Sequence, residues 1–138
     1  MRRLLITVFA ALALGASSLA TATPAGAEAA YQKVAAEILQ DLYARNPTYA
    51  TALGLHEYDG RLEDYSRAAV DDEDRAIAGF KKALEAIDPQ GLTQTSRLDR
   101  EVLLHSLDSR RIRNDEIRGW AKNPDNYSSG ITGAAGDE

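Results

Sequence analysis

The run from Asn46 to Asp59 constrains the fold more than any other stretch, because it must turn the chain between two long amphipathic segments. Proline disfavours helical angles in the residue before it, so the preceding helix should end at about Arg45. Asparagine is a good helix cap, and Pro47 suits the first turn of a new helix, where no N–H is needed. Gly54 supplies the left-handed residue that commonly ends a helix, with the next residue folded back on the last turn. The sequence therefore predicts a short helical corner over residues 47–53.

Two longer helices are predicted on either side of this corner. Residues 28–45 carry apolar side chains at spacings of three, four and seven, the period of one helical face: Tyr31, Val34, Ala35, Ile38, Leu42 and Tyr43. Residues 67–87, which Ser66 can cap, have a seven-residue apolar repeat with two further apolar positions: Val70, Ile77, Leu84, Phe80 and Ile87. Such a repeat forms a seam against another helix.

A third helix is predicted over residues 94–118, with Thr93 or Ser96 as its cap. Its inner face should be apolar, formed by Leu98, Val102, Leu103 and Leu107. Beyond Asp108 the apolar pattern thins, and basic residues from Arg110 to Arg113 alternate with acids. We interpret that half as a solvated face, or as one paired with something outside this chain. No segment has the period of a strand, so the predicted fold class is all-α, with three main amphipathic helices.

The first 27 residues have the organisation of an export signal. A basic start at Arg2 and Arg3 precedes an apolar core from Leu4 to Leu14 and a small-residue cleavage site at Ala25-Gly26-Ala27. The apolar core is shorter than the ~20 residues that a membrane span needs. We therefore expect a signal peptide over residues 1–27 with cleavage after Ala27, a helical part over 28–120, and an irregular, truncated tail over 121–138.

Composition excludes several kinds of site and partner. The chain has no cysteine, which excludes disulfides, thiolate metal sites and a lipid-modified amino-terminal cysteine. Loss of Arg2 and Arg3 with the leader changes the formal net charge from −5 to −7. An acidic surface does not attract nucleic acid or anionic lipid, so neither is expected as a partner. We expect an exported, soluble protein of the periplasm or the extracellular space that is not a lipoprotein.

No constellation for catalysis or metal binding is evident. His56 and Glu57 begin like the zinc-peptidase motif His-Glu-x-x-His, but Gly60 occupies the place of the second histidine. His105, mid-helix, is interpreted as a packed or surface residue, although two histidines can still meet in space. The acidic run from Asp71 to Asp74 lacks the ligand alternation and the glycine of a calcium loop.

The carboxy-terminal segment also lacks the sequence pattern of a catalytic or phosphate-binding site. Ser128 and Ser129 have neither a nucleophile elbow nor a nearby histidine, and the glycines of Gly130 to Gly133 lack the spacing of a phosphate loop and its lysine. We therefore assign no catalytic, cofactor-binding or metal-binding residue in this chain.

Several stretches in order along the chain carry a family resemblance. They are the run from Asn46 to Leu62, Leu84-Glu85-Ala86-Ile87-Asp88, Gly91-Leu92-Thr93, Arg97-Leu98-Asp99, and Trp120-x-x-Asn123-Pro124-x-x-Tyr127-Ser128-Ser129-Gly130-Ile131. Together they cover about residues 31–131 and resemble the amino-terminal part of the bacterial family called domain of unknown function 885. The resemblance implies an all-helical fold.

The resemblance also implies a function outside this chain. Members of the family are several times longer and similar to zinc metallopeptidases, and their metal motif lies far towards the carboxy terminus. No position here matches that motif, and the chain departs from the family after Ile131. We therefore expect an amino-terminal helical fragment that is inactive alone. Zinc would bind only in the missing carboxy-terminal part, which would also be its partner. The alternative is a free-standing exported helical bundle that binds a protein partner.

Overall fold

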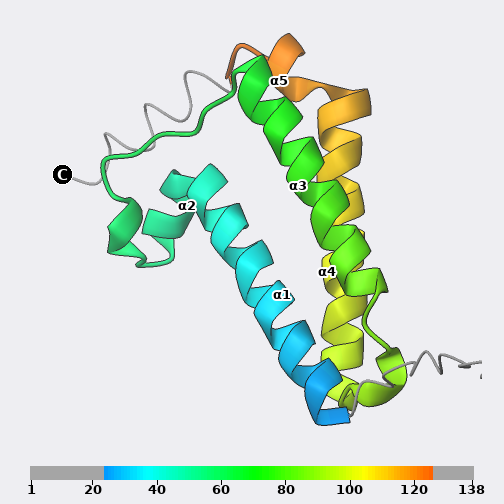
Figure 1. Ribbon diagram of the computed structural model, residues 1–138. Helices are drawn as coiled ribbons and strands as arrows, with labels where there is room; N and C mark the ends of the chain where they lie inside the picture. Colours follow the sequence, from blue (N-terminus) through cyan, green and yellow to red (C-terminus); the bar gives the residue numbers. More distant parts are fainter. Residues whose placement is uncertain (1–23, 126–138) are drawn as a thin grey trace, which may run out of the picture.

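The computed structural model describes residues 24–125, and every element in this range is helical (Figure 1). In chain order the elements are α1 (Pro24–Arg45), α2 (Pro47–Ala52), the 3-10 turn η1 (His56–Tyr58), α3 (Arg67–Glu85), the 3-10 turn η2 (Pro89–Gly91), α4 (Gln94–Ile112), the π-helical turn η3 (Arg113–Ile117) and α5 (Gly119–Lys122). The predicted all-α fold class is confirmed.

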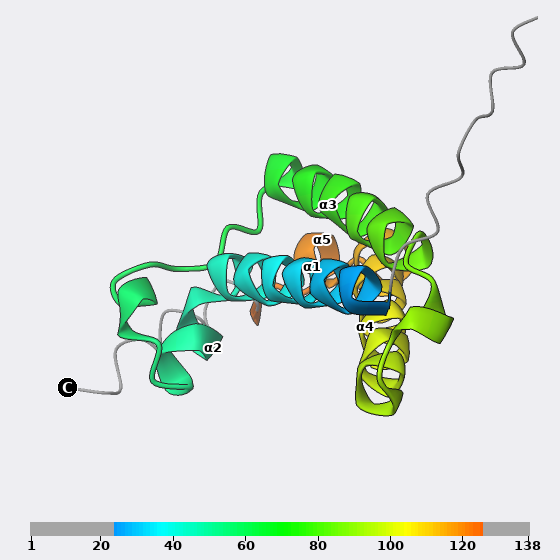
Figure 2. The same ribbon diagram turned by 60° about the horizontal axis from the view of Figure 1, so that its bottom comes forward.

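The three long helices pack against one another as a bundle. Helices α1 and α4 run in the same general direction and α3 runs the opposite way, as Figures 1 and 2 show. One end of the bundle therefore holds the start of α1, the end of α3 and the start of α4. The other end holds the end of α1, the start of α3 and the end of α4, with α2 and η1 beside it.

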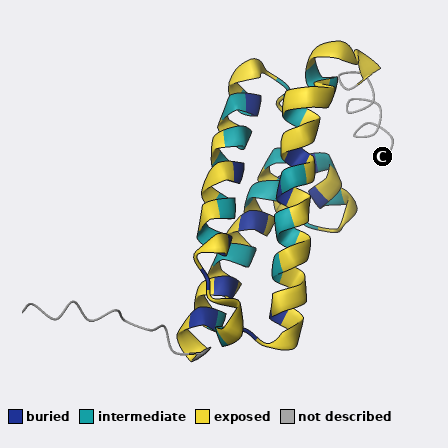
Figure 3. Cartoon of the chain, turned by 90° about the vertical axis from the view of Figure 1, so that its right-hand side faces the viewer, coloured by how far each residue is buried: buried dark blue, intermediate teal, exposed yellow. Residues whose placement is uncertain are grey.

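The core lies between the three long helices, and Figure 3 shows its buried positions on their facing sides. The fully or nearly fully buried members of the main cluster are Ala27, Tyr31, Ile38, Ile77, Leu84, Ile87, Leu92 and Leu107. The predicted seven-residue seam on α3 is confirmed, since Val70, Ile77 and Leu84 are its buried residues. Burial of such side chains is the main favourable term in folding, at roughly 25 cal/mol per Å² of apolar surface.

The corner between α1 and α3 forms where the sequence predicts it. Gly54 has φ +84°, and the N–H groups of Gly54 and Leu55 donate to the carbonyls of Thr51 and Ala50 at 2.8 and 3.0 Å. These two bonds are the Schellman pattern that closes a helix end. The corner also contacts the bundle, because the Tyr43 and Tyr58 rings pack edge to face at 6.4 Å.

The predicted side-chain cap at Asn46 is wrong. The Asn46 side chain turns back and donates to the Leu42 carbonyl at 2.8 Å, at the end of α1. The start of α2 is instead capped by Glu63, which accepts hydrogen bonds from the Thr48 N–H at 3.2 Å and from the Thr48 hydroxyl. A carboxylate is favourable there because the unpaired N–H groups carry partial positive charge.

Helix α1 begins at Pro24, before the predicted start at residue 28. Proline suits a first helical turn and alanine is the best helix former, so the small residues that resemble a cleavage site also extend the helix. Ala27 is buried in the core. The rest of the predicted leader, residues 1–23, lies outside the described residues, as does most of the predicted irregular tail, residues 126–138. Helix α5 continues to Lys122, within that predicted tail.

The predicted inner face of α4 is partly wrong. Leu107 is buried and Leu103 and Leu104 pack against the core, but Leu98 and Val102 are 59% and 66% exposed. At 3.6 residues per turn, Leu98 points about 180° away from Leu107, so the two cannot share one face. The outer side of α4 is therefore apolar in part. Of the helices between residues 24 and 125, none has the length and apolar character to cross a membrane.

Candidate functional site

A buried arginine joins the three long helices at one end of the bundle. The Arg110 side chain on α4 is 4% exposed. Its Nη2 lies 2.8 Å from Asp41 Oδ2 on α1, and its Nε lies 2.9 Å from Glu73 Oε1 on α3. A buried charge is stable only when it is paired and hydrogen-bonded. These three residues, which we call the charged clamp, therefore hold the three helices at fixed positions.

Further ion pairs surround the charged clamp. Arg45 Nε donates to Asp41 Oδ1 at 2.8 Å and its Nη2 donates to Asp72 Oδ2 at 2.8 Å. The hydrogen bond from Arg45 lowers the pKa of Asp72. Burial alone would lower the pKa of Arg45, but its bonds to Asp72 and Asp41 give a net rise. The end of α1 is thereby joined to the start of α3.

The charged clamp corrects the interpretation of residues 110–113 as a solvated face at one position, Arg110; residues 111–113 are exposed as predicted. Arg110 continues the inner face of α4 three residues after Leu107, and its partners lie within the chain rather than outside it. The four consecutive acids of α3, Asp71 to Asp74, are bonded to Arg67, Arg45, Arg110 and Asn114, with Asn114 shared by Glu73 and Asp74. A helix directs consecutive side chains to different sides, so this acidic run does not converge on one point.

The charged clamp positions the turn that follows α4. Asn114 Nδ2 donates to Glu73 Oε2 and Asp74 Oδ1 at 2.9 and 3.0 Å, and the Asn114 carbonyl accepts from Trp120 Nε1 at 3.1 Å. Arg118 adopts a left-handed conformation, φ +55°, which ends the π turn and starts α5. Asn114 thus links the Trp120 indole to the start of α3 by hydrogen bonds.

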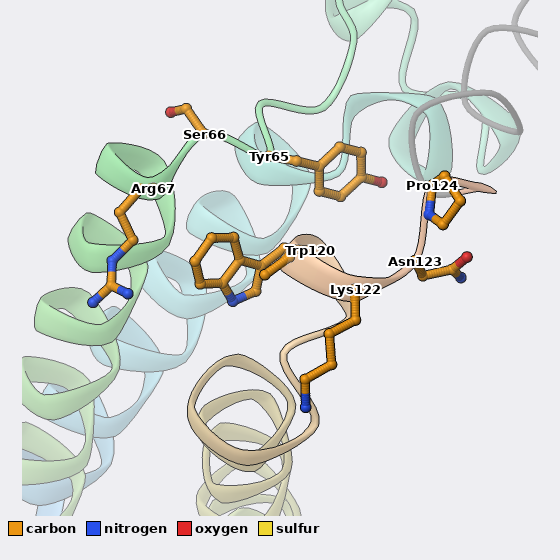
Figure 4. Close-up of a pocket in the computed structure, with 8 residues that line it drawn as sticks. Tyr65, Ser66, Arg67, Trp120, Lys122, Asn123 and Pro124 are labelled. Carbon is orange, nitrogen blue, oxygen red and sulfur yellow. The ribbon is translucent and has the colours of Figure 1, made fainter.

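A pocket lies between the start of α3 and the α5 segment (Figure 4). Its volume is about 440 Å³, and it is lined by Tyr65, Ser66, Arg67, Trp120, Ala121, Lys122, Asn123 and Pro124. The guanidinium carbon atoms of Arg67 and Arg118 lie 5.4 and 5.7 Å from the Trp120 ring centre, a distance at which a cation is attracted to an aromatic face. We regard this as the candidate functional site of the described chain.

The two histidines do not form such a site. His56 Nδ1 lies 3.1 Å from Asp59 Oδ2 in the corner, and His105 is exposed on α4. The pKa of Asp59 is lowered mainly by the hydrogen bond from the Thr51 hydroxyl and further by His56. Between residues 24 and 125 no three His, Asp or Glu side chains gather in a way that could hold a metal ion. Ser128, Ser129 and Gly130 to Gly133 lie outside the described residues.

Comparison with known proteins gives a family. Residues 47–135 match the model of a family described as bacterial protein of unknown function (DUF885). The chain belongs to this family. The match includes the corner, α3, α4 and α5, and therefore both sides of the pocket. No curated protein and no solved structure matches the chain.

Sequence reasoning did not predict the pocket. Trp120 and Asn123-Pro124 mark a second corner in the sequence, but nothing in the pattern pairs them with Tyr65 to Arg67, more than fifty positions earlier along the printed chain. The pairing depends on Arg110 and Asn114, whose polar side chains do not contribute to an apolar period. The sequence signal that could have indicated this pairing is Arg110, a charged residue at an inner position of α4.

Proposed function

We propose that this chain is the amino-terminal helical part of an exported DUF885 protein resembling metallopeptidase-like hydrolases, and that it packs against the rest of that protein. On this proposal the chain carries no catalytic residue and holds no zinc, which belongs to the carboxy-terminal part. The proposal rests on the family resemblance and on one structural observation, the apolar outer face of α4.

The apolar residues on the outer face of α4 are Leu98, Val102 and Ile112, which are 59%, 66% and 50% exposed, with the exposed His105 and Ser109 between them. Their spacings of four and ten residues place them on one side of the helix, opposite Leu107. Single exposed apolar residues are common, but several along one helical face are typical of a protein interface. A larger protein would cover this face with a further helix.

The test replaces two residues of this face. The Leu98→Ser/Val102→Ser variant should fold as the parent does, because exposed substitutions usually change stability by less than about 0.5 kcal/mol. The parent chain should bind a hydrophobic dye, self-associate at micromolar concentration, and form a complex with the separately produced carboxy-terminal part of a full-length family member. The variant should lose all three properties, whereas the matched control Leu39→Ser, an exposed apolar residue on α1, should keep them.

The alternative is a free-standing exported bundle that binds another protein. It is favoured if the parent chain is a monodisperse monomer that unfolds in one sharp transition. This monomer would bind neither the hydrophobic dye nor the carboxy-terminal part. If the parent and the double variant form the complex equally well, the outer face of α4 is not part of the interface, and the proposal is contradicted.

Metal analysis tests the assignment of zinc elsewhere. Catalytic zinc usually has three protein ligands, and this chain offers two histidines and no cysteine. We expect no stoichiometric zinc after dialysis of the purified chain. One tightly bound zinc per chain would contradict this prediction and would make His56 and His105 candidate zinc ligands.

Export is tested by the mass of the secreted chain, which should begin at Glu28. Because Ala27 is buried within α1, its peptide bonds are protected once the helix packs, so cleavage must precede folding. Intact-mass measurement of secreted material gives the amino terminus directly. A soluble secreted product that retains Met1 to Ala27 would refute the predicted cleavage.

A further inference from the structure

We propose that the pocket between the start of α3 and α5 binds a small aromatic carboxylate. The inference does not depend on the proposed function, since the pocket lies within the described chain and none of the outer apolar residues of α4 lines it. Three features carry it: the ring-lined shape of the pocket, the sign of its charges and the fixed position of its indole.

The pocket is an open hollow with the volume and the ring lining of a small-molecule site. Figure 4 shows the Tyr65 ring on one side, the Trp120 ring on the other and Pro124 at the far edge. The volume of about 440 Å³ falls within the roughly 300–1,000 Å³ typical of ligand pockets. Rings on both sides select a flat apolar group, because stacked or edge-to-face contacts need a planar partner.

The charged side chains that line the pocket are both cations, Arg67 and Lys122. Arg118 adds a third positive charge beside the Trp120 ring. Arg67 is also ion-paired with Asp71 at 2.8 Å, so the positive charge open to a ligand comes mainly from Lys122. A guanidinium presents several N–H donors in a plane that matches a carboxylate, and lysine adds a point charge. The pocket is therefore complementary to one anionic group joined to a ring.

The indole is held in place before any ligand arrives. Trp120 Nε1 donates to the Asn114 carbonyl, and Asn114 is fixed by Glu73 and Asp74. On the opposite side, Ser66 caps α3 by accepting from the Ala69 N–H at 3.2 Å, and Arg67 Nε is oriented by Asp71 at 2.8 Å. A site whose groups are already ordered loses less entropy on binding. Both sides of the pocket are ordered by bonds that involve no ligand.

Binding can be measured without a label because Trp120 is the single tryptophan of the chain. Phenylacetate and phenylacetamide have nearly the same shape and differ in charge, so they separate the anionic contact from the apolar one. Titration of the full chain should change Trp120 fluorescence with phenylacetate bound about tenfold more tightly than phenylacetamide, as a charge-assisted hydrogen bond predicts. Lys122→Gln should reduce phenylacetate affinity about tenfold and leave phenylacetamide affinity unchanged.

The matched control is Lys82→Gln, an exposed lysine near the end of α3 and away from the pocket, which should bind phenylacetate as the parent does. Circular dichroism establishes that both variants are folded. Equal affinity for acid and amide, no fluorescence change with either, or an unaltered Lys122→Gln variant would each overturn the proposal. A third arm uses the peptide Ala-Ala-Phe with a free carboxyl end. Tighter binding of this peptide than of phenylacetate would assign the pocket to polypeptide ends and overturn the small-molecule assignment.

Discussion

The two ends of the three-helix bundle are built from the same three helices but are held together by different interactions. At one end, which we call the apolar end, Tyr31 of α1, Leu84 of α3 and Leu92 before α4 are buried together. At the other, the charged end, Arg110 is buried between Asp41 and Glu73. Apolar contacts tolerate small shifts, whereas a buried ion pair requires particular atoms at particular distances. The charged end therefore specifies how the helices are aligned, and the apolar end supplies most of the burial.

The difference matters for the candidate site because the pocket lies beside the charged end. Trp120 is positioned through Asn114 and Glu73, and Glu73 also binds Arg110. A change in the charged clamp should therefore alter the pocket as well as stability. A change at the apolar end should reduce stability without changing the geometry of the pocket in molecules that remain folded.

The largest expected effect is at the apolar end, with Leu84→Ala. Leu84 is fully buried, and removal of a buried leucine leaves a cavity that costs about 2–5 kcal/mol. A small bundle has a total stability of about 5 kcal/mol, so much of the variant should be unfolded at 37 °C. Urea unfolding followed by circular dichroism measures the loss. The control is Leu39→Ala on α1, whose exposed side chain should cost much less; equal losses would contradict the assignment of the core.

The charged end should respond to Arg110→Met with a smaller loss. The substitution fills similar space but removes the buried partner of both carboxylates, so that Asp41 keeps only Arg45 and Glu73 keeps only Asn114. Breaking such a pair costs about 3–5 kcal/mol when all groups are buried, and the partial exposure of both acids lowers our expectation to about 2–3 kcal/mol. Urea unfolding measures the loss, and Trp120 fluorescence should shift because Glu73, which accepts from Asn114, is no longer held by Arg110.

The control for this prediction removes the two carboxylates as well. The triple variant Arg110→Met/Asp41→Asn/Glu73→Gln should recover most of the lost stability, because none of the three positions then carries a charge. It should not recover the Trp120 fluorescence of the parent. Full recovery of both would mean that the charged clamp stabilises the bundle without aligning it.

The comparison also explains how much the sequence could predict. The seam on α3, the end of α1 and the Gly54 corner follow from local rules, because apolar spacing and backbone preference act within a few residues. These predictions are confirmed. The cap of α2 is Glu63, which lies outside the run from Asn46 to Asp59, and the Asn46 side chain bonds to Leu42 instead. The local preference of asparagine for helix starts therefore predicted the wrong capping residue.

The charged end and the pocket could not be predicted in the same way. A periodic pattern assigns charged residues to the outside, yet Arg110 is buried because two acids from other helices meet it. That match is between side chains 69 and 37 positions away in sequence, and nothing local encodes it. Counting charged residues at inner helical positions would have identified Arg110. It would not have identified which acids pair with it.

The smallest expected effect is the replacement Glu28→Gln, which removes the one carboxylate that joins α1 to α4 at the apolar end. Glu28 accepts from the Ser96 hydroxyl at 2.6 Å and from the Thr93 N–H at 3.1 Å, at the start of α4. The hydrogen bond from Ser96, with smaller contributions from Gln32 and Thr93, lowers the pKa of Glu28 below its usual 4.5. The unfolded chain therefore binds this proton more readily than the folded one does. The stabilisation is fully present above about pH 4.5 and is lost as the pH falls through the folded-state pKa.

Thermal unfolding from pH 7 to pH 3 tests this linkage. At pH 7, Glu28→Gln should melt at a slightly lower temperature than the parent, because glutamine keeps one acceptor but loses the charge and the second acceptor. The difference between the two melting temperatures should shrink below pH 4.5 and vanish once Glu28 is protonated. Glu37→Gln is the matched control on the same helix, since Glu37 has only an exposed ion pair with Lys33 at 3.7 Å, which is worth little. A difference between the parent and Glu28→Gln that stays constant across the whole pH range would show that the charge of Glu28 does not hold α1 to α4. The contact of α1 with α4 at the apolar end would then depend on burial alone, and the contrast between the two ends would be sharper than the structure indicates.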